Sequence, residues 1–189
     1  MHVGRTKAVP GEGPAGAAVM FVGEGPGERE DQEGRPFVGA AGKFLTELLA
    51  SVGLERSSVF ITNIVKCRPP ANRAPRQSEV EACNPYLQAQ IRIVAPRIIC
   101  PLGTPAIKTV MGPEYSVGQV HGKPIRREGR IILPLYHPAA ALYDGSLREV
   151  QLEDFKVLRR LIDEEAGRGE GQVGQGTTGG EPEPLQKWM

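Results

Sequence analysis

The stretch Met20-Phe-Val-Gly-Glu-Gly-Pro-Gly-Glu-Arg-Glu-Asp-Gln-Glu-Gly-Arg-Pro-Phe-Val-Gly-Ala-Ala-Gly42 decides the fold of this chain. It opens on the end of an apolar run, residues 17–22, turns into a loop dense in glycine and carboxylates, and leads into an amphipathic segment. A buried strand followed by a glycine-rich loop and a helix is typical of α/β proteins, where ligands bind beyond the carboxyl ends of the strands. We therefore expect a binding site at this loop, and an ordinary strand-to-helix connection is the alternative interpretation.

The spacing of the glycines excludes two common phosphate-binding motifs. No Gly-Lys-Ser/Thr follows the loop, as a P-loop requires, and the glycines of residues 23–27 do not continue into Gly-x-Gly-x-x-Gly. Four acidic residues lie within residues 28–33 and would repel a phosphate unless Arg29 and Arg35 offset them.

Composition narrows the class of protein. The 189 residues suffice for one domain with a sizeable core, and 40% hydrophobic with 24% charged residues is ordinary for a globular protein. No apolar run reaches the ~18–20 residues that cross a bilayer, and residues 1–7 lack the apolar core of a secretion signal, so we expect a cytoplasmic protein. The net charge of +1 argues neither for nor against nucleic acid. Three cysteines in such a chain are not a disulfide framework.

Hydrophobic periodicity predicts alternating strands and helices. Strands are expected at residues 17–22, 59–65 and 97–102, a β-hairpin at 124–127 and 130–135, and helices at 40–52, 78–94, 103–110 and 147–162. This order favours a three-layer α/β/α sandwich around a central parallel sheet of about four strands. We expect an extended arm over residues 1–16, a folded domain over 17–164, and a disordered tail over 165–189.

The helix expected over residues 78–94 has a recognisable start. Ser78 is a candidate N-cap, and Glu81 three residues later would complete a capping box. Its buried face would consist of Val80, either Cys83 or Tyr86, and then Leu87, Ile91 and Val94.

Three loops follow three of the expected strands and would meet at one edge of the sheet. They carry Glu24, Gly25, Glu30 and Phe37 in the first loop, Asn63 in the second and His137 in the last. Such side chains suit a planar heterocycle, because an aromatic ring can stack on it and a carboxamide can both donate and accept at an imide edge. A histidine can donate to an oxygen where negative charge develops.

Each of these residues also has a structural interpretation. Phe37 after Pro36 is equally well explained as a core residue, Asn63 as the cap of a turn, and His137 before Pro138 as a structural loop histidine. Taken together they favour a binding site, but their spacing alone does not identify the ligand.

Four motifs follow one another along the chain: Gly23-Glu-Gly-Pro-Gly, Gly34-Arg-Pro-Phe-Val-Gly, Ile61-Thr-Asn-Ile-Val-Lys-Cys-Arg-Pro-Pro and His137-Pro-Ala. In this order they resemble the motifs of the family 4 uracil-DNA glycosylases, the iron–sulfur type. The resemblance covers roughly residues 5–163. It implies an enzyme that flips deoxyuridine out of DNA, hydrolyses the N-glycosidic bond and so initiates base-excision repair.

The resemblance also implies how uracil would be bound. Phe37 would stack on the base, and Asn63 would hydrogen-bond the N3–H and O4 edge, which excludes cytosine. Glu30 matches the position that crowds C5, so the methyl group of thymine would clash. His137 would donate to O2 as the leaving uracil becomes anionic.

Catalytic and DNA-contact roles are implied in the same way. Glu24, with Gly25 beside it, would position or activate the attacking water and stabilise the cationic sugar. In the segment after His137, Leu142 or Tyr143 would be the wedge that enters the DNA. The remaining candidates for DNA contact are Arg148, Arg68 and Arg73.

The family holds a [4Fe–4S] cluster with four cysteines. Cys67 and Cys83, 16 positions apart, match the second pair of ligands, whereas the N-terminal Cys-x-x-Cys is absent from this sequence, so we expect the native start to lie upstream. Cys100 is expected to be a small buried hydrophobe. With two of four ligands, the sequence predicts poor cluster binding, lower stability, an untethered arm and an untethered loop at residues 68–76, but a largely intact pocket.

The partners expected are uracil-containing DNA and no membrane, with the protein a monomer. Trp188, in the closing Glu183-Pro-Leu-Gln-Lys-Trp-Met, is a candidate docking motif for a sliding clamp or a single-strand-binding protein, and random tail composition is the alternative. A different class of function is a catalytically weak DNA- or nucleotide-binding relative that has lost its cluster. The presence of Glu24, Asn63 and His137 together favours the enzyme.

Overall fold

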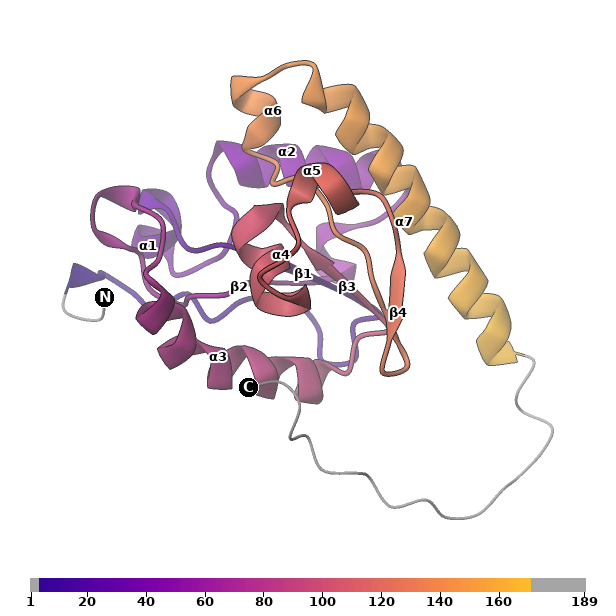
Figure 1. Cartoon of the computed structure of the whole chain (residues 1–189), viewed down its shortest axis with the longest axis horizontal. Helices are drawn as coiled ribbons and strands as arrows, with labels where there is room; N and C mark the ends of the chain where they lie inside the picture. The colour runs from indigo at the N-terminus through magenta and orange to yellow at the C-terminus, as the bar shows by residue number, and fades with distance from the viewer. Residues whose placement is uncertain (1–3, 171–189) are drawn as a thin grey trace, which may run out of the picture.

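The computed structural model describes residues 4–170, in which a central sheet lies between two layers of helices (Figure 1). The strands are β1 (Val19–Gly23), β2 (Phe60–Asn63), β3 (Ile98–Pro101), β4 (Ile125–Arg127) and β5 (Arg130–Ile132). The helices are α1 (Glu28–Glu33), α2 (Ala40–Ser51), α3 (Gln77–Val94), α4 (Gly103–Met111), α5 (Val117–Val120), α6 (Ala140–Tyr143) and α7 (Leu147–Glu170), with 3-10 turns η2 (Arg56–Ser58) and η3 (Pro70–Asn72). None of the helices within residues 4–170 is long and apolar enough to span a membrane.

The five strands of the sheet are ordered β2-β1-β3-β5-β4. The first four are parallel, and β4 adds an antiparallel edge through a tight hairpin whose turn residues Glu128 and Gly129 both have positive φ. The predicted three-layer sandwich is confirmed, with five strands rather than about four. Because Gly23 pairs with Asn63 in register, the loops that follow β1 and β2 leave the same edge of the sheet.

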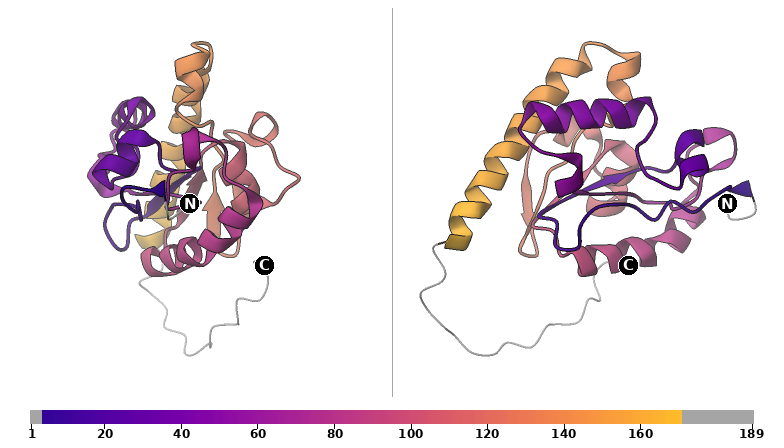
Figure 2. Two further views of the ribbon diagram at one scale, coloured as in Figure 1. Left: turned by 90° about the vertical axis from the view of Figure 1, so that its left-hand side faces the viewer. Right: turned by 180° about the vertical axis from the view of Figure 1, so that it is seen from behind.

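Two apolar cores fill the space between the layers, one on each face of the sheet. Alternate residues of β1 face opposite sides, so Phe21 packs with α2 and α7, whereas Met20 packs with α3 and α4. The rings of Phe21 and Phe155 stack with centroids 5.9 Å apart and fix α7 against the sheet. Figures 1 and 2 show α2 and α3 on opposite sides of the strands, with α7 running along one flank.

Two helices differ from the sequence prediction at one end, and the structure also decides which residue completes the buried face of α3. In α3 the capping box is formed by Arg76 and Glu79 rather than by Ser78 and Glu81, because Glu79 Oε2 accepts the Arg76 N–H at 2.7 Å. Along the same helix Tyr86 is 64% exposed, so the partly buried Cys83 belongs to the apolar face instead. Helix α7 continues past residue 162 to Glu170, and Arg97 and Arg126 both bond Glu165 in the added turns.

The expectation of an untethered N-terminal arm is wrong for residues 9–12. Val9 donates to Lys66 O at 2.8 Å, and Glu12 and Ile61 exchange backbone hydrogen bonds of 2.9 and 2.8 Å, which extend the sheet beside β2. The loop at residues 68–76 is also tied to the fold, because Arg73 forms an ion pair of 2.7 Å with Glu79. Hydrogen bonds and an ion pair therefore hold both segments.

Candidate active site

A cavity of about 350 Å³ opens at the carboxyl ends of the strands. The loop after β1 and helix α1 form one wall, the end of β2 and the loop at residues 69–75 form another, and the segment after β5 closes it. The predicted site residues that line this one cavity are Glu24, Gly25, Glu30, Phe37, Asn63, Arg73, His137 and Tyr143. Side chains that are more than 100 positions apart in the sequence therefore share one space.

Two glycines allow Phe37 to take its place in the cavity wall. A Cβ on Gly23, the last residue of β1, would lie 2.6 Å from Phe37 Cζ and would collide with Asn63 Oδ1. A Cβ on Gly42 would collide with the carbonyl oxygen of Phe37. Phe37 is 6% exposed and its ring lies 5.4 Å from that of His137, centroid to centroid. Close packing thus presents the Phe37 ring at the cavity without leaving it free in solvent.

Glu30 is positioned by α1, a short helix where the sequence predicted only a loop. Its Oε1 accepts the N–H groups of Val38 and Gly39 at 2.9 and 2.8 Å, so the carboxylate closes the loop that carries Phe37. The sequence signal for the end of this helix is Gly34, because glycine commonly ends a helix, and in the structure Gly34 takes the left-handed φ of 79°. Six residues are too few for periodicity to show such a helix.

Asn63 offers an unused hydrogen-bond acceptor to the cavity. Its side chain is 2% exposed, and Oδ1 has no hydrogen-bond partner anywhere in residues 4–170. Leaving a buried acceptor without a donor costs about 1–3 kcal/mol, and a ligand N–H would remove that cost. The end of β2 is held in turn by Lys66, whose Nζ donates to the Asn63 carbonyl at 2.7 Å.

Glu24 and His137 have displaced pKa values with a common cause. Burial raises the pKa of the Glu24 carboxyl above that of an ordinary glutamate. Burial also lowers the pKa of His137 to about 4, against a smaller opposing effect of Glu30, so the imidazole is neutral near pH 7. Because His137 Nδ1 accepts the N–H of Ala139 at 3.2 Å, the single ring hydrogen belongs on Nε2. The site therefore combines a glutamate whose pKa is raised with a neutral imidazole donor.

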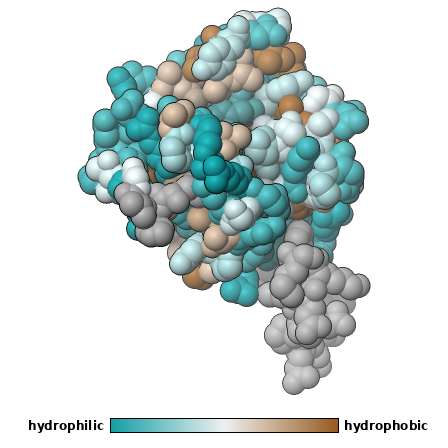
Figure 3. Space-filling view, turned by 60° about the vertical axis from the view of Figure 1, so that its left-hand side comes forward, coloured by the Kyte–Doolittle hydropathy of each residue, from teal (hydrophilic) through white to brown (hydrophobic). Residues whose placement is uncertain are grey.

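The predicted DNA-contact residues are not all at the cavity. Tyr143 and Arg73 line it, and Leu142 stands beside Tyr143 on α6, 51% exposed. The surface view shows hydrophobic residues among hydrophilic ones near the top of the molecule (Figure 3). Arg68 and Arg148 do not line the cavity. Arg148 pairs with Glu47 at 2.8 Å and covers the ring of Phe44, and Arg68 bonds Asn72.

The cysteine corner, defined here as Arg5, Cys67 and Cys83, lies outside the cavity lining. Cys67 is buried and its Sγ accepts a hydrogen bond of 2.8 Å from Arg5 Nη1, while Cys83 is partly buried on α3. Cys100 is fully buried in β3, and burial raises the pKa of its thiol, as expected of a core residue. Within residues 4–170 no group of three or more His, Cys, Asp or Glu side chains could hold a metal ion. Since a [4Fe–4S] cluster takes four thiolates, these residues do not fit one.

Comparison with known proteins adds independent information. The model of the uracil DNA glycosylase superfamily matches residues 10–159. The type-4 uracil-DNA glycosylase of Sulfurisphaera tokodaii is 54% identical, over 83% of this chain and 76% of that protein. The enzymes of the same name from Saccharolobus solfataricus and Thermotoga maritima are 48% and 46% identical, over 84% and 87% of this chain and 77% and 88% of their own lengths. At this identity and coverage, the chain belongs to the type-4 uracil-DNA glycosylases of the uracil DNA glycosylase superfamily.

Proposed function

We propose that this protein excises uracil from DNA by hydrolysing the N-glycosidic bond, the step that opens base-excision repair. The observation that carries the proposal is that Phe37, Asn63, Glu24 and His137 line one cavity of about 350 Å³. The type-4 uracil-DNA glycosylases to which the chain is similar agree with this activity. Acting on DNA, the enzyme would work in the cytoplasm, as a monomer.

Recognition of the base would depend on the unpaired acceptor of Asn63. Oδ1 would accept the N3–H of uracil and Nδ2 would donate to O4, and cytosine presents the opposite pattern at both positions. Phe37 would stack on the flat face of the base. Glu30, fixed by the amides of Val38 and Gly39, would occupy the space that the C5 methyl of thymine needs.

Bond cleavage would use the other two side chains. The oxygen of a water molecule would bond to C1′ of the sugar while the C1′–N1 bond breaks, and the electron pair of the C1′–N1 bond would leave with uracil. The proton that the water loses would pass to Glu24 or to solvent and finally to the uracil anion. The Nε2–H of neutral His137 would donate to O2 as negative charge develops there, an interaction worth ~2.7–4 kcal/mol at comparable oxyanion sites. The carboxylate of Glu24, beside Gly25, would hold the water and stabilise the oxocarbenium-like sugar.

Contacts with the DNA around the extruded base are proposals as well. Leu142 or Tyr143 of the exposed α6 would enter the base stack, and Arg73 at the cavity would contact a phosphate. Arg68 and Arg148 are further candidates for phosphate contact. A sliding clamp or single-strand-binding protein docking at Trp188 is a prediction that lies outside the described residues.

The cluster that characterises this family has no step in this mechanism. The 189 residues contain three cysteines, and one of them, Cys100, is buried in a strand. Cys67 and Cys83 would be the two ligands that this chain supplies, so we propose that it holds no complete [4Fe–4S] cluster by itself.

An oligonucleotide with a single uracil, tested both single- and double-stranded, separates the enzyme from a mere binder. We expect strand cleavage after alkali treatment together with release of free uracil. Retarded but uncut DNA would instead support the catalytically weak binding protein.

The variant Asn63→Asp loses the amide donor and should reduce the preference for uracil over cytosine by ~1–3 kcal/mol, about 5- to 150-fold. Asn72→Asp is the matched control, because Asn72 lies at the cavity but is exposed.

A further inference from the structure

The backbone of Phe37 is in an unusual conformation for the role that the proposed function gives it. Its φ of 51° lies in the left-handed region, which residues with a bulky side chain rarely adopt. Such a conformation persists only where the surroundings fix it. The contacts of the Pro36-Phe37 peptide therefore decide where the aromatic ring stands.

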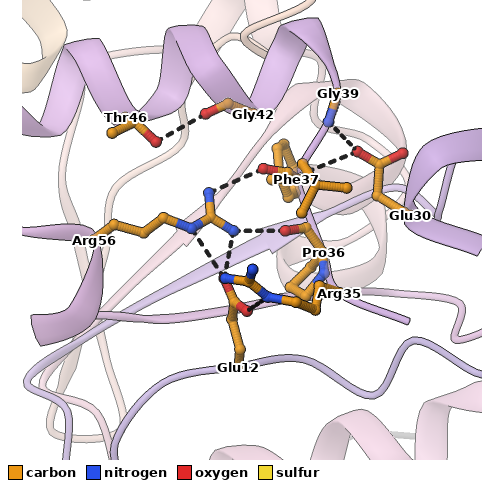
Figure 4. Close-up of polar contacts among 10 residues, drawn as sticks. Glu12, Glu30, Arg35, Pro36, Phe37, Gly39, Gly42, Thr46 and Arg56 are labelled. Carbon is orange, nitrogen blue, oxygen red and sulfur yellow. Dashed lines mark hydrogen bonds and ion pairs between the residues drawn. The ribbon is translucent and has the colours of Figure 1, made fainter. Parts of the chain in front are cut away.

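Arg56, nineteen positions further along the chain, supplies those contacts. Its Nη1 donates to the Phe37 carbonyl at 3.0 Å and its Nη2 donates to the Pro36 carbonyl at 2.5 Å. Figure 4 shows the guanidinium reaching the two carbonyl groups from the side away from Glu30. Since Glu30 holds the amides of Val38 and Gly39, the loop is fixed on its carbonyl groups and on its N–H groups by two different side chains.

Glu12 orients the guanidinium. Its Oε1 accepts hydrogen bonds from Nε and Nη2 of Arg56 at 2.9 and 2.6 Å, so the edge of the guanidinium that carries Nε is bound as well. Glu12 is itself fixed by its backbone pairing with Ile61. Burial would raise the pKa of Glu12, but hydrogen bonds from Arg35 and Arg56 outweigh it and lower the pKa, so the carboxylate is charged at neutral pH.

We propose that Arg56 is a positioning residue that holds Phe37 in its stacking position against the extruded base, with Glu12 orienting Arg56. Arg56 does not line the cavity, so it acts only through the loop. We call Glu12, Arg56 and the two carbonyl groups the Arg56 clamp. The inference deepens the proposed function and rests on it.

Arg35 provides a matched control in the same network. It also binds Glu12, with Nε 2.8 Å from Oε2, but no hydrogen bond joins its guanidinium to a loop carbonyl within residues 4–170. Arg35→Ala therefore removes an arginine from Glu12 and leaves Phe37 supported, whereas Arg56→Ala removes the support.

The test measures inhibition by free uracil, together with kcat and KM on a uracil oligonucleotide, well below the melting temperature of each variant. Arg56→Ala should raise the inhibition constant for uracil about tenfold, equivalent to ~1.4 kcal/mol and within the ~1–3 kcal/mol of base–aromatic stacking. The KM for DNA should change less than about twofold, because phosphate contacts dominate it. Arg35→Ala should leave the inhibition constant within about twofold of wild type.

A double-mutant cycle distinguishes positioning from general stabilisation. In a Phe37→Ala background, Arg56→Ala should change the inhibition constant less than about twofold, because the side chain that it positions is gone. Arg56→Lys keeps the charge opposite Glu12 but not the planar guanidinium, so its melting temperature should lie closer to that of the wild type than that of Arg56→Ala does, while uracil binding stays weak.

Three results would overturn the inference. The role of the Arg56 clamp would be refuted by equal effects of Arg56→Ala and Arg35→Ala, by fully additive effects in the cycle, or by normal uracil binding in Arg56→Lys. None of these results would affect the conclusion that the wild type excises uracil. Absence of uracil release by the wild-type protein would instead overturn the proposed function, and the role of the clamp with it.

Discussion

The uracil cavity and the cysteine corner are only four positions apart on the chain, at Asn63 and Cys67, yet they differ in completeness. Every group that the proposed reaction needs lines the cavity, and the loop that carries Phe37 is fixed by hydrogen bonds from Glu30 and Arg56. The corner offers two thiols and a guanidinium. The two regions therefore differ in what holds them, since side-chain hydrogen bonds fix the loop of the cavity from both sides and a hydrogen bond joins Arg5 to Cys67 at the corner.

Lys66 lies between Asn63 and Cys67 along the chain and bonds to both β2 and α3, the elements that carry Asn63 and Cys83. Its buried ammonium donates to Thr62 Oγ1, the Asn63 carbonyl and Gln90 Oε1, each at 2.7 Å, and thereby joins the end of β2 to α3. Burial lowers the pKa of Lys66 to about 8. A fully bonded side chain thus holds these two elements together at the point from which Asn63 enters the cavity.

The largest effect is expected from removal of a cavity side chain. His137→Ala should lower kcat about 10²–10³-fold, because it deletes the Nε2–H donor that we propose for the developing charge on uracil O2. His121→Ala is the matched control. His121 does not line the cavity, and its Nδ1 lies 2.9 Å from Asp154 Oδ2. Single-turnover release of uracil, with melting curves for both variants, measures the difference. A His137→Ala enzyme with more than a tenth of wild-type kcat would contradict the proposed role.

The sequence predicted the parts of this comparison that depend on strands and their ends. Apolar runs located β1, β2 and β5, and parallel strands bring their following loops to one edge, so the sequence alone places Asn63 and His137 near Glu24. The family resemblance then supplied their roles. Neither source indicated the Arg56 clamp, because Arg56 binds backbone carbonyl groups and Glu12, which binds Arg56, lies 44 positions before it. Contacts of that kind have no sequence spacing to reveal them.

An intermediate effect is expected from pH, through Glu24. Burial raises the pKa of this carboxyl, and the carboxylate is the form that stabilises the cationic sugar. As pH falls through the raised pKa, kcat should therefore fall about tenfold per pH unit. His137, with a pKa of about 4, stays neutral as long as the pH is above that value. Glu24→Gln should have a low kcat and should lose this acid limb, and a wild-type kcat that does not fall as the pH is lowered below neutral would contradict this role for Glu24.

The smallest effect is expected at the corner, where the comparison can be broken most directly. Replacing Cys67 and Cys83 together by Ser keeps an acceptor for Arg5 and removes both candidate cluster ligands. Because the cavity wall is held by Glu30, Arg56 and backbone pairing, kcat/KM on a uracil oligonucleotide should change less than about twofold, a limit that corresponds to ~0.4 kcal/mol. Loss of activity at an unchanged melting temperature would show instead that the corner controls the cavity.

Anaerobic addition of iron and sulfide to the wild-type chain tests whether two thiolates suffice to hold a cluster. We expect no stable visible absorbance of a [4Fe–4S] cluster, because such a cluster takes four thiolates.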